Sequence, residues 1–189
     1  MNITNYFLLP SILTYILINN YIINPSNFYF TVYDTIYNYE YYRLFSCLLI
    51  NFNLLQIIIN TLYLKNIINY IQQRLYINNI FYFLIYNIVL PKLILIAITI
   101  ILNIFNIHNN IIYYYFYGID DILISLIYIY GYLYNSDINI YDVIKINSNY
   151  LYIYKIILNL FVFNVYNHSN LIFNISGLLS GLIISNIFI

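Results

Sequence analysis

The chain has 189 residues, of which 63% are hydrophobic and only 6% are charged, whereas an ordinary soluble domain is about 25% charged. Six basic and six acidic residues cannot cover a compact soluble domain with polar side chains. The net charge is zero, with no basic run for nucleic acid, and the single cysteine, Cys47, excludes a disulfide framework and a thiolate metal cluster. We therefore expect an integral membrane protein without cofactor or metal.

The charged residues are spaced so that they leave long uncharged stretches, and a membrane-spanning helix needs about 20 mainly apolar residues. The fold class we predict is all-α, a polytopic membrane protein in which residues 1–189 form one transmembrane domain. The first helix lacks a following small-residue cleavage site, so we expect it to be retained. The six predicted helices, with ends uncertain by about 2 to 4 residues, are 6–24, 44–64, 79–104, 118–134, 149–166 and 170–188.

The connections predict an orientation, because short cytosolic connections carry an excess of Lys and Arg. Lys65 and Arg74 fall between the second and third predicted helices, and Lys145 falls between the fourth and fifth. Arg43, on the opposite side, argues against this orientation. We predict that both termini face the cytosol, and that the long aromatic first connection, Pro25 to Tyr42, lies at the membrane interface.

Polar side chains also occur in or beside the predicted helices, where contact with lipid would be costly, so we expect them to turn inward and pair. Asn53, Gln56 and Asn60 recur at steps of three and four and should share one helix face. The polar set marks either hydrogen-bonded packing between helices or a functional site. Its members are Asn51, Asn53, Gln56, Asn60, Lys92, Asp120, Asp121, Lys155, Asn159, Asn164 and Asn174.

Two of these residues, Lys92 and Lys155, carry a positive charge. The simpler expectation is that each extends its ammonium group to the membrane interface, and the alternative is that each pairs with Asp120 or Asp121.

The last predicted helix carries small residues at every fourth position, Gly177, Gly181 and Ser185. Such a stripe lets a neighbouring backbone approach closely, so we expect close helix packing here.

Several short motifs, in order along the chain, resemble those of rhomboid-like proteins. The stretch 42–46, which begins with Tyr42 and Arg43, resembles the Trp-Arg motif before the second helix of that family, with Tyr in place of Trp. Gln56 and Asn60 match the pair, usually His and Asn, that serves the oxyanion hole of active rhomboid proteases. The resemblance covers essentially the whole chain and implies a six-helix rhomboid-like fold.

At the catalytic positions the sequence departs from the protease pattern. Residues 118–121 fall where the proteases carry Gly-x-Ser-Gly, and here Asp120 stands in place of the serine. Residues 174–181 match the pattern His-x-x-Gly-x-x-x-Gly, and here Asn174 stands in place of the histidine. An intramembrane serine protease needs a serine hydroxyl beside a base. Ser125 and His168 lie roughly 7.5 Å and 9 Å along a helix from the required places. We predict an inactive pseudoprotease.

Within the inactive branch, the chain is most similar to the rhomboid-like endoplasmic reticulum proteins that contain a ubiquitin-associated domain, with derlins next. The motifs that carry this likeness are 9–11, 32–34, 42–44, 74–76 with Phe81, and 175–182. The ubiquitin-associated domain itself is not found in residues 1–189, so ubiquitin binding does not carry over from the family.

The resemblance implies an adaptor or scaffold in membrane-protein quality control and endoplasmic-reticulum-associated degradation. The partners it implies are the lipid bilayer, membrane-protein clients and subunits of a ubiquitin-ligase complex, without nucleic acid. The alternatives are an active intramembrane serine protease and a small transporter whose polar path would use Lys92, Lys155, Asp120 and Asp121. Transporters commonly have internal repeats and helices broken by Gly or Pro. The chain shows no internal repeat and few such breaks.

Overall fold

The computed structural model describes residues 3–51, 53–75, 80–107, 110–134, 137–140, 144–147, 150–161 and 168–188. The all-α class is confirmed, because helices account for most of the described chain. They are α1 (Ile3–Asn19), α2 (Val32–Tyr37), α3 (Arg43–Ser46), α4 (Leu54–Leu75), α5 (Ile80–Ile104), α6 (Asp120–Tyr134), α7 (Leu151–Phe161) and α8 (His168–Phe188). Three short 3-10 helices are η1 (Pro25–Asn27), η2 (Cys47–Leu49) and η3 (Ile111–Tyr113).

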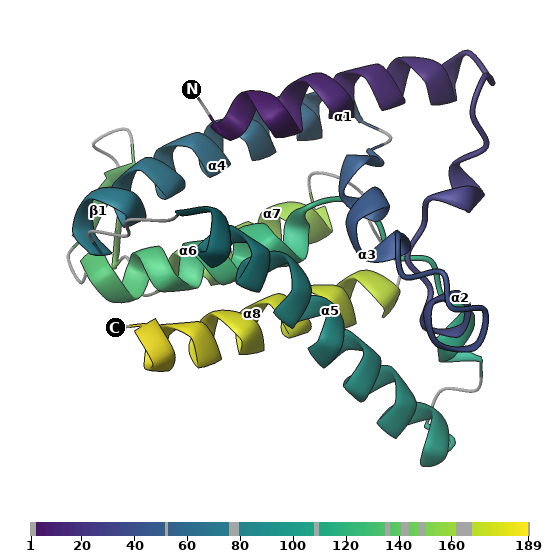
Figure 1. The fold of residues 1–189 in the computed structure, drawn as a ribbon. Coiled ribbons are helices and arrows are strands. Elements are labelled where there is room, and N and C mark those ends of the chain that lie inside the picture. The colour runs from purple at the N-terminus through teal and green to yellow at the C-terminus, as the bar shows by residue number, and fades with distance from the viewer. Residues whose placement is uncertain are drawn as a thin grey trace.

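Helix α6 lies at the centre of the molecule. It packs against α4, α5, α7 and α8, and every residue from Asp120 to Ile127 is buried. Figure 1 shows α1 and α4 on one side of α6 and α8 on the other. Both ends of the chain lie at the same end of the molecule as the β hairpin, whereas α2 and α3 lie at the opposite end (Figure 1).

The second predicted helix, 44–64, is wrong in its bounds. Residues 43–49 form α3 and η2, the chain then leaves the helix, and α4 begins at Leu54 after a bend of 110°. The cause is local: the side chain of Asn53 accepts a hydrogen bond from the backbone N–H of Leu55 at 2.9 Å, which is how Asn begins a helix rather than continues one. Asn53 is therefore exposed and does not share the buried face of Gln56 and Asn60.

The connection predicted between the second and third helices is also wrong. Helix α4 continues for 22 residues to Leu75, so Lys65 and Arg74 lie within it. Lys65 is exposed and lies ten residues before the end, about 15 Å along the helix. Of the two, only Arg74 lies near the end of α4.

A two-stranded hairpin was not predicted from the sequence. It joins α6 to α7: β1 (Asp137–Ile140) pairs antiparallel with β2 (Ile144–Asn147), with Ile138 opposite Ile146. Lys145 lies in β2, in the connection where we predicted it.

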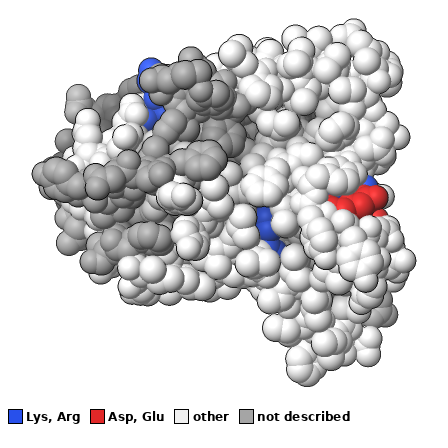
Figure 2. Space-filling model, viewed as in Figure 1, with Lys and Arg blue, Asp and Glu red and all other residues white. Residues whose placement is uncertain are grey.

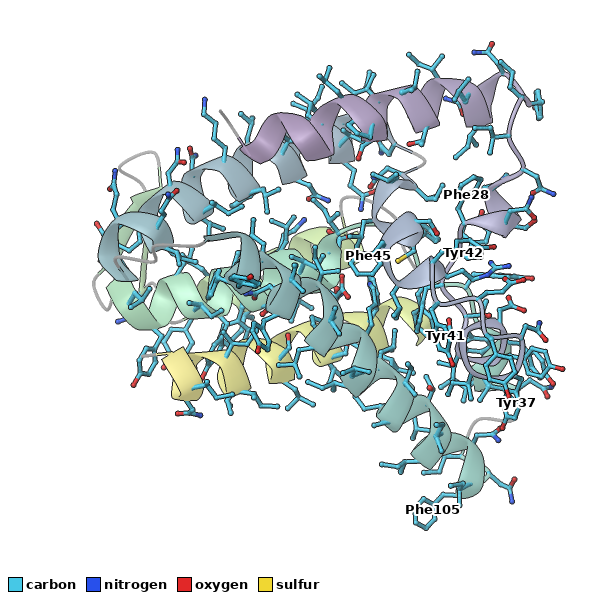
Figure 3. All side chains as sticks on the ribbon, in the orientation of Figure 1. Phe28, Tyr37, Tyr41, Tyr42, Phe45 and Phe105 are labelled. Atoms are coloured by element: carbon cyan, nitrogen blue, oxygen red, sulfur yellow. The ribbon has the colours of Figure 1, made fainter. Side chains whose placement is uncertain are left out.

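The first long connection is ordered by aromatic residues. Phe30 and Phe116 exchange two backbone hydrogen bonds of 2.9 Å, which ties this connection to the segment before α6. The ring of Tyr29 lies 5.1 Å from that of Tyr115 and 5.6 Å from that of Tyr117. Figure 3 shows Phe28, Tyr37, Tyr41, Tyr42 and Phe45 at this end of the molecule, and Phe105 at the far end of α5.

Among the described residues, one helix is long and apolar enough to cross a membrane by itself, Tyr82–Ile104. Arg43–Leu49 and Leu54–Gln73 meet the same criterion only when taken together as one bent span. Leu8–Asn19 and Leu171–Ile187 are apolar but shorter.

Many large apolar side chains are exposed among the described residues. Figure 2 shows few charged atoms on the face it presents, apart from residues drawn in grey. Exposed large apolar side chains occur on α1, α4, α5 and α8: Leu9, Leu13, Leu55, Leu62, Leu93, Ile101, Leu182 and Ile187.

Candidate functional site

The start of α6 places two adjacent carboxyl groups in the interior. Gly118 has a φ of +85°, a left-handed conformation that favours glycine, and its N–H donates to the carbonyl of Cys47 at 2.8 Å. This turn leads directly into Asp120 and Asp121 in the first turn of the helix. Carboxylates are favoured there because the helix dipole is positive at its N-terminal end.

Asp120 is held by three side chains from two other helices. The amide of Gln56 donates to its Oδ2 at 2.8 Å, and the amide of Asn60 donates to its Oδ1 at 3.1 Å. Lys155 Nζ lies 3.2 Å from the same Oδ1 and also donates to the Asn60 carbonyl oxygen at 2.7 Å. The structure thus brings together the pair matched to the oxyanion hole and the residue at the nucleophile position. We call Gln56, Asn60, Asp120 and Lys155 the Asp120 network.

Asp121 points to a different partner. Lys92 Nζ lies 2.6 Å from its Oδ2, and both side chains are fully buried. The same ammonium group lies 4.1 Å from the centre of the Phe173 ring, a distance typical of a cation–π contact. The second Asp121 oxygen accepts the backbone N–H of Ile122 at 2.9 Å.

The expectation that both lysines reach the membrane interface is therefore wrong. Lys92 is 0% and Lys155 is 1% exposed, and each pairs with one of the two carboxylates. The reason is that an unpaired carboxylate in an apolar interior is strongly destabilising. Pairing with the two carboxylates therefore outweighs the hydration that the lysines would gain at the interface. Because Asp120 and Asp121 bind lysines from different helices, they do not converge on one point.

Helix α8 meets α6 at its small residues. A Cβ atom added to Gly177 would lie 2.3 Å from the carbonyl oxygen of Asp121, and one added to Gly181 would lie 2.8 Å from that of Ser125. Neither position has room for a side chain. The close approach expected from the stripe is present. Ser185 is buried and donates to the carbonyl of Leu182 on its own helix at 2.9 Å.

Asn174 lies one turn before Gly177 and is 2% exposed. Its Nδ2 is the one buried side-chain nitrogen or oxygen of the described residues that has no hydrogen-bond partner. A buried donor of this kind costs roughly 1 to 3 kcal/mol. Asn174 Nδ2 is therefore a donor that the described interior leaves unsatisfied.

The hydroxyl groups near this region are engaged elsewhere. Ser125 donates to the side-chain oxygen of Asn87 at 2.8 Å, and Ser176 and Ser180 donate to carbonyls of their own helix at 2.7 Å. The sequence reading missed Asn87, whose only signal was one amide in an apolar stretch. The predictions for the side chains of Asn159, Asn164 and His168 lie outside the described residues.

Arg43 organises the first connection. Its guanidinium group donates to the carbonyls of Ser26 and Tyr29 at 2.8 Å and pairs with Glu40, with Asp34 3.6 Å away. Tyr42, the other half of the motif, donates from its hydroxyl to the Asn27 carbonyl at 3.1 Å. The role of this motif is structural, since neither side chain bonds to the Asp120 network.

Two tyrosines beside the start of α6 stay neutral at physiological pH. Burial and the neighbouring Tyr117 and Tyr115 phenols raise the pKa of Tyr29 to about 12. Burial, and secondly the charge of Asp120, raise the pKa of Tyr117.

Over the described part of the chain, no three His, Cys, Asp or Glu side chains come together as a group that could hold a metal ion.

The comparisons with known proteins give no family for this chain. No family model matches it, and neither does any curated protein or any solved structure.

Proposed function

We propose that the protein is a catalytically inactive rhomboid-like membrane protein of several membrane-spanning helices, which acts by binding. The observation that carries this proposal is the Asp120 network. The position matched to the nucleophile holds a carboxylate that two amides and one ammonium group engage. A carboxylate held in this way has no hydroxyl to activate, and the amide of Asn174 cannot take up a proton at neutral pH.

The distribution of polarity supports the membrane placement. Buried ion pairs lie inside a molecule whose described surface carries many large apolar side chains, which is the arrangement that lipid favours. Helix α6 has 15 residues, about 22 Å in length, against a hydrocarbon core of about 30 Å. The apolar helices Leu8–Asn19 and Leu171–Ile187 are also short, and short spans that face lipid thin the bilayer locally.

The expected role is that of an adaptor in the endoplasmic reticulum that retains membrane-protein clients and presents them to a ubiquitin-ligase complex. The physical basis is the buried Asn174 donor, which has no partner among the described residues and to which a client helix would hydrogen-bond after displacing its neighbours. Client binding would satisfy an amide that the isolated protein leaves without a partner.

The test replaces Asn174 with Leu, which keeps a similar volume and removes the donor. We expect stability to stay equal or rise by about 1 kcal/mol, because an unsatisfied buried group is lost. Cross-linked client helices, recovered after mild-detergent purification of the tagged protein, should decrease at the same time. Ser185→Ala, on the same helix with its hydroxyl bonded locally, is the matched control.

Two results would contradict the proposal. One is unchanged client recovery from Asn174→Leu. The other is a set of co-purified proteins made only of secretory-pathway transporters and coat components, with no ligase or degradation subunits.

A further inference from the structure

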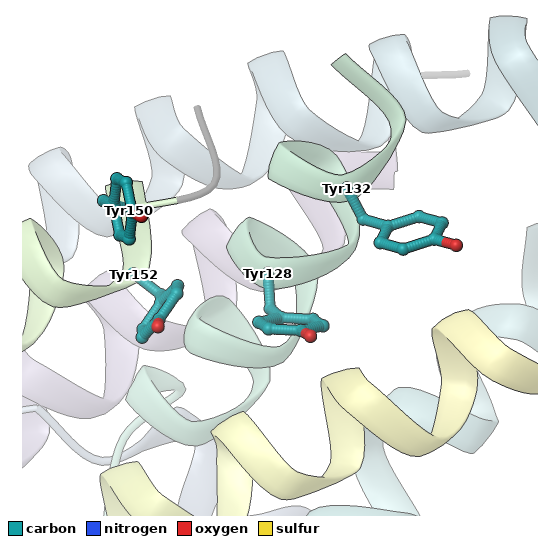
Figure 4. A pocket seen from close by; sticks show the side chains of 4 residues that line it. All are labelled: Tyr128, Tyr132, Tyr150 and Tyr152. Atoms are coloured by element: carbon teal, nitrogen blue, oxygen red, sulfur yellow. The ribbon is translucent and has the colours of Figure 1, made fainter. Parts of the chain in front are cut away.

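Four tyrosines line a cavity between α6 and the start of α7. Tyr128 and Tyr132 come from α6, and Tyr150 and Tyr152 come from the start of α7. The volume of the cavity is about 290 Å³, just below the roughly 300 to 1,000 Å³ of pockets for drug-sized ligands. It is the right scale for a small headgroup. We call these four residues the tyrosine pocket (Figure 4).

The rings are held in place by their neighbours. Tyr128 and Tyr132 are four residues apart and so share one face of α6. The ring of Tyr128 lies 5.6 Å from that of Tyr152. The Cβ atom of Tyr128 lies 3.0 Å from the position that a Cβ added to Gly181 would occupy. Tyr132 and Tyr150 are 54% and 58% exposed. The pocket therefore has a fixed inner wall and an accessible outer one.

The chemistry of the lining selects the ligand. Among the described residues that line the pocket, none is charged, so an ammonium group with N–H donors would find no carboxylate on these four side chains. A quaternary ammonium group has no N–H to satisfy and needs only the negative faces of aromatic rings. The phenol hydroxyls can donate hydrogen bonds to a phosphate beside such a group.

The location selects the source of the ligand. Tyr132 is in the last turn of α6, and Tyr150 directly precedes α7, at the end of the molecule that holds the β hairpin (Figure 1). In a membrane protein, helix ends lie at the headgroup level, where tyrosine is enriched. We propose that the tyrosine pocket binds the phosphocholine headgroup of a membrane lipid, an inference that rests on the proposed membrane placement.

The experiment places the purified full chain in lipid nanodiscs that contain phosphatidylcholine, phosphatidylethanolamine and phosphatidylglycerol in equal amounts. Native mass spectrometry then measures which lipid remains bound. We expect phosphatidylcholine to be enriched. An analogue in which carbon replaces the headgroup nitrogen, giving an uncharged group of the same shape, should not be enriched. Soluble phosphocholine, added in excess, tests whether the headgroup alone competes.

Variants test whether the rings carry the effect. Tyr132→Leu and Tyr150→Leu should each reduce the enrichment by roughly two- to five-fold, the effect of losing one exposed cation–π contact. Tyr132→Phe keeps the ring and should retain most of it. Tyr82→Leu, at an exposed tyrosine on α5, should change nothing.

Equal retention of phosphatidylcholine and its uncharged analogue would overturn the proposal, and so would equal losses in Tyr132→Phe and Tyr132→Leu. A chain that enters nanodiscs but shows no lipid preference refutes the pocket alone. A chain that does not enter them refutes the membrane placement as well.

Discussion

Asp120 and Lys155 form an ion pair whose two charges are buried in the interior of the protein. Taking two charges out of water is costly, and their attraction offsets that cost only while both are present. We predict that Lys155→Met destabilises the protein by about 3 to 5 kcal/mol. The double variant Lys155→Met with Asp120→Asn should recover most of the loss, because no unpaired charge remains. Reversible unfolding in mixed micelles measures both.

Lys65→Met serves as the control, because Lys65 is exposed on α4 and its replacement should leave stability nearly unchanged. Losses that simply add in the double variant would show that Lys155 and Asp120 do not depend on each other.

Sequence reasoning identified the residues of this site and offered pairing of the lysines with Asp120 or Asp121 as an alternative, but it did not show which lysine binds which carboxylate. Asp120, Gln56 and Asn60 stood out as polar groups in apolar stretches. That Lys92 binds Asp121 and Lys155 binds Asp120 follows from where α5 and α7 pack against α6, and no local pattern contains that information. The tyrosine pocket was missed for the same reason, because its two pairs are separated by the β hairpin.

Helix contacts depend on space as well as chemistry, and α6 and α8 approach so closely that neither Gly177 nor Gly181 has room for a side chain. We predict that Gly177→Ala destabilises the protein more than Gly181→Ala, within a range of about 1 to 3 kcal/mol. The added Cβ would meet a backbone oxygen at 2.3 Å in the first case and at 2.8 Å in the second. Leu in either position should reduce abundance and resistance to protease further.

Unchanged stability in both glycine variants would refute this helix contact. Ser180 offers a control on the same helix, because its hydroxyl bonds to the Gly177 carbonyl and Ser180→Ala adds no atoms.

The elements show where sequence patterns suffice. The small-residue stripe predicted close packing of the last helix because spacing alone defines it. The break before α4 was missed because residues 44–64 form one uncharged, mainly apolar run, and Asn53 was assigned to a helix face rather than to a helix start. The hairpin was missed because its four-residue strands, Asp137–Ile140 and Ile144–Asn147, lie in what read as a connection.

At the scale of the whole molecule, the positions of the chain ends bear on orientation. Both ends and the hairpin with Lys145 lie at one end of the structure, and Arg74 lies near the end of α4. Arg43, the basic residue that argues against this orientation, is paired with Asp34 and Glu40, so its charge is balanced locally. Lys65, within α4, no longer counts as a connection residue.

We therefore keep the prediction that both termini face the cytosol. Once the natural Asn-x-Ser/Thr sequences are removed, a glycosylation acceptor added after Ile189 should remain unmodified in cells. One inserted between α5 and η3 should be modified. Modification at the C-terminus would place that end in the lumen and reverse the orientation.

The proposed function, that of an inactive rhomboid-like protein, requires that the protein binds without catalysing. The most direct measurement reconstitutes the purified protein in lipid vesicles with a panel of fluorogenic transmembrane substrates and a serine-reactive probe. We predict neither cleavage nor labelling, because Asp120 has no hydroxyl to activate and the amide of Asn174 cannot act as its base. Cleavage or labelling that disappears in Asp120→Ala would show that the protein is an enzyme.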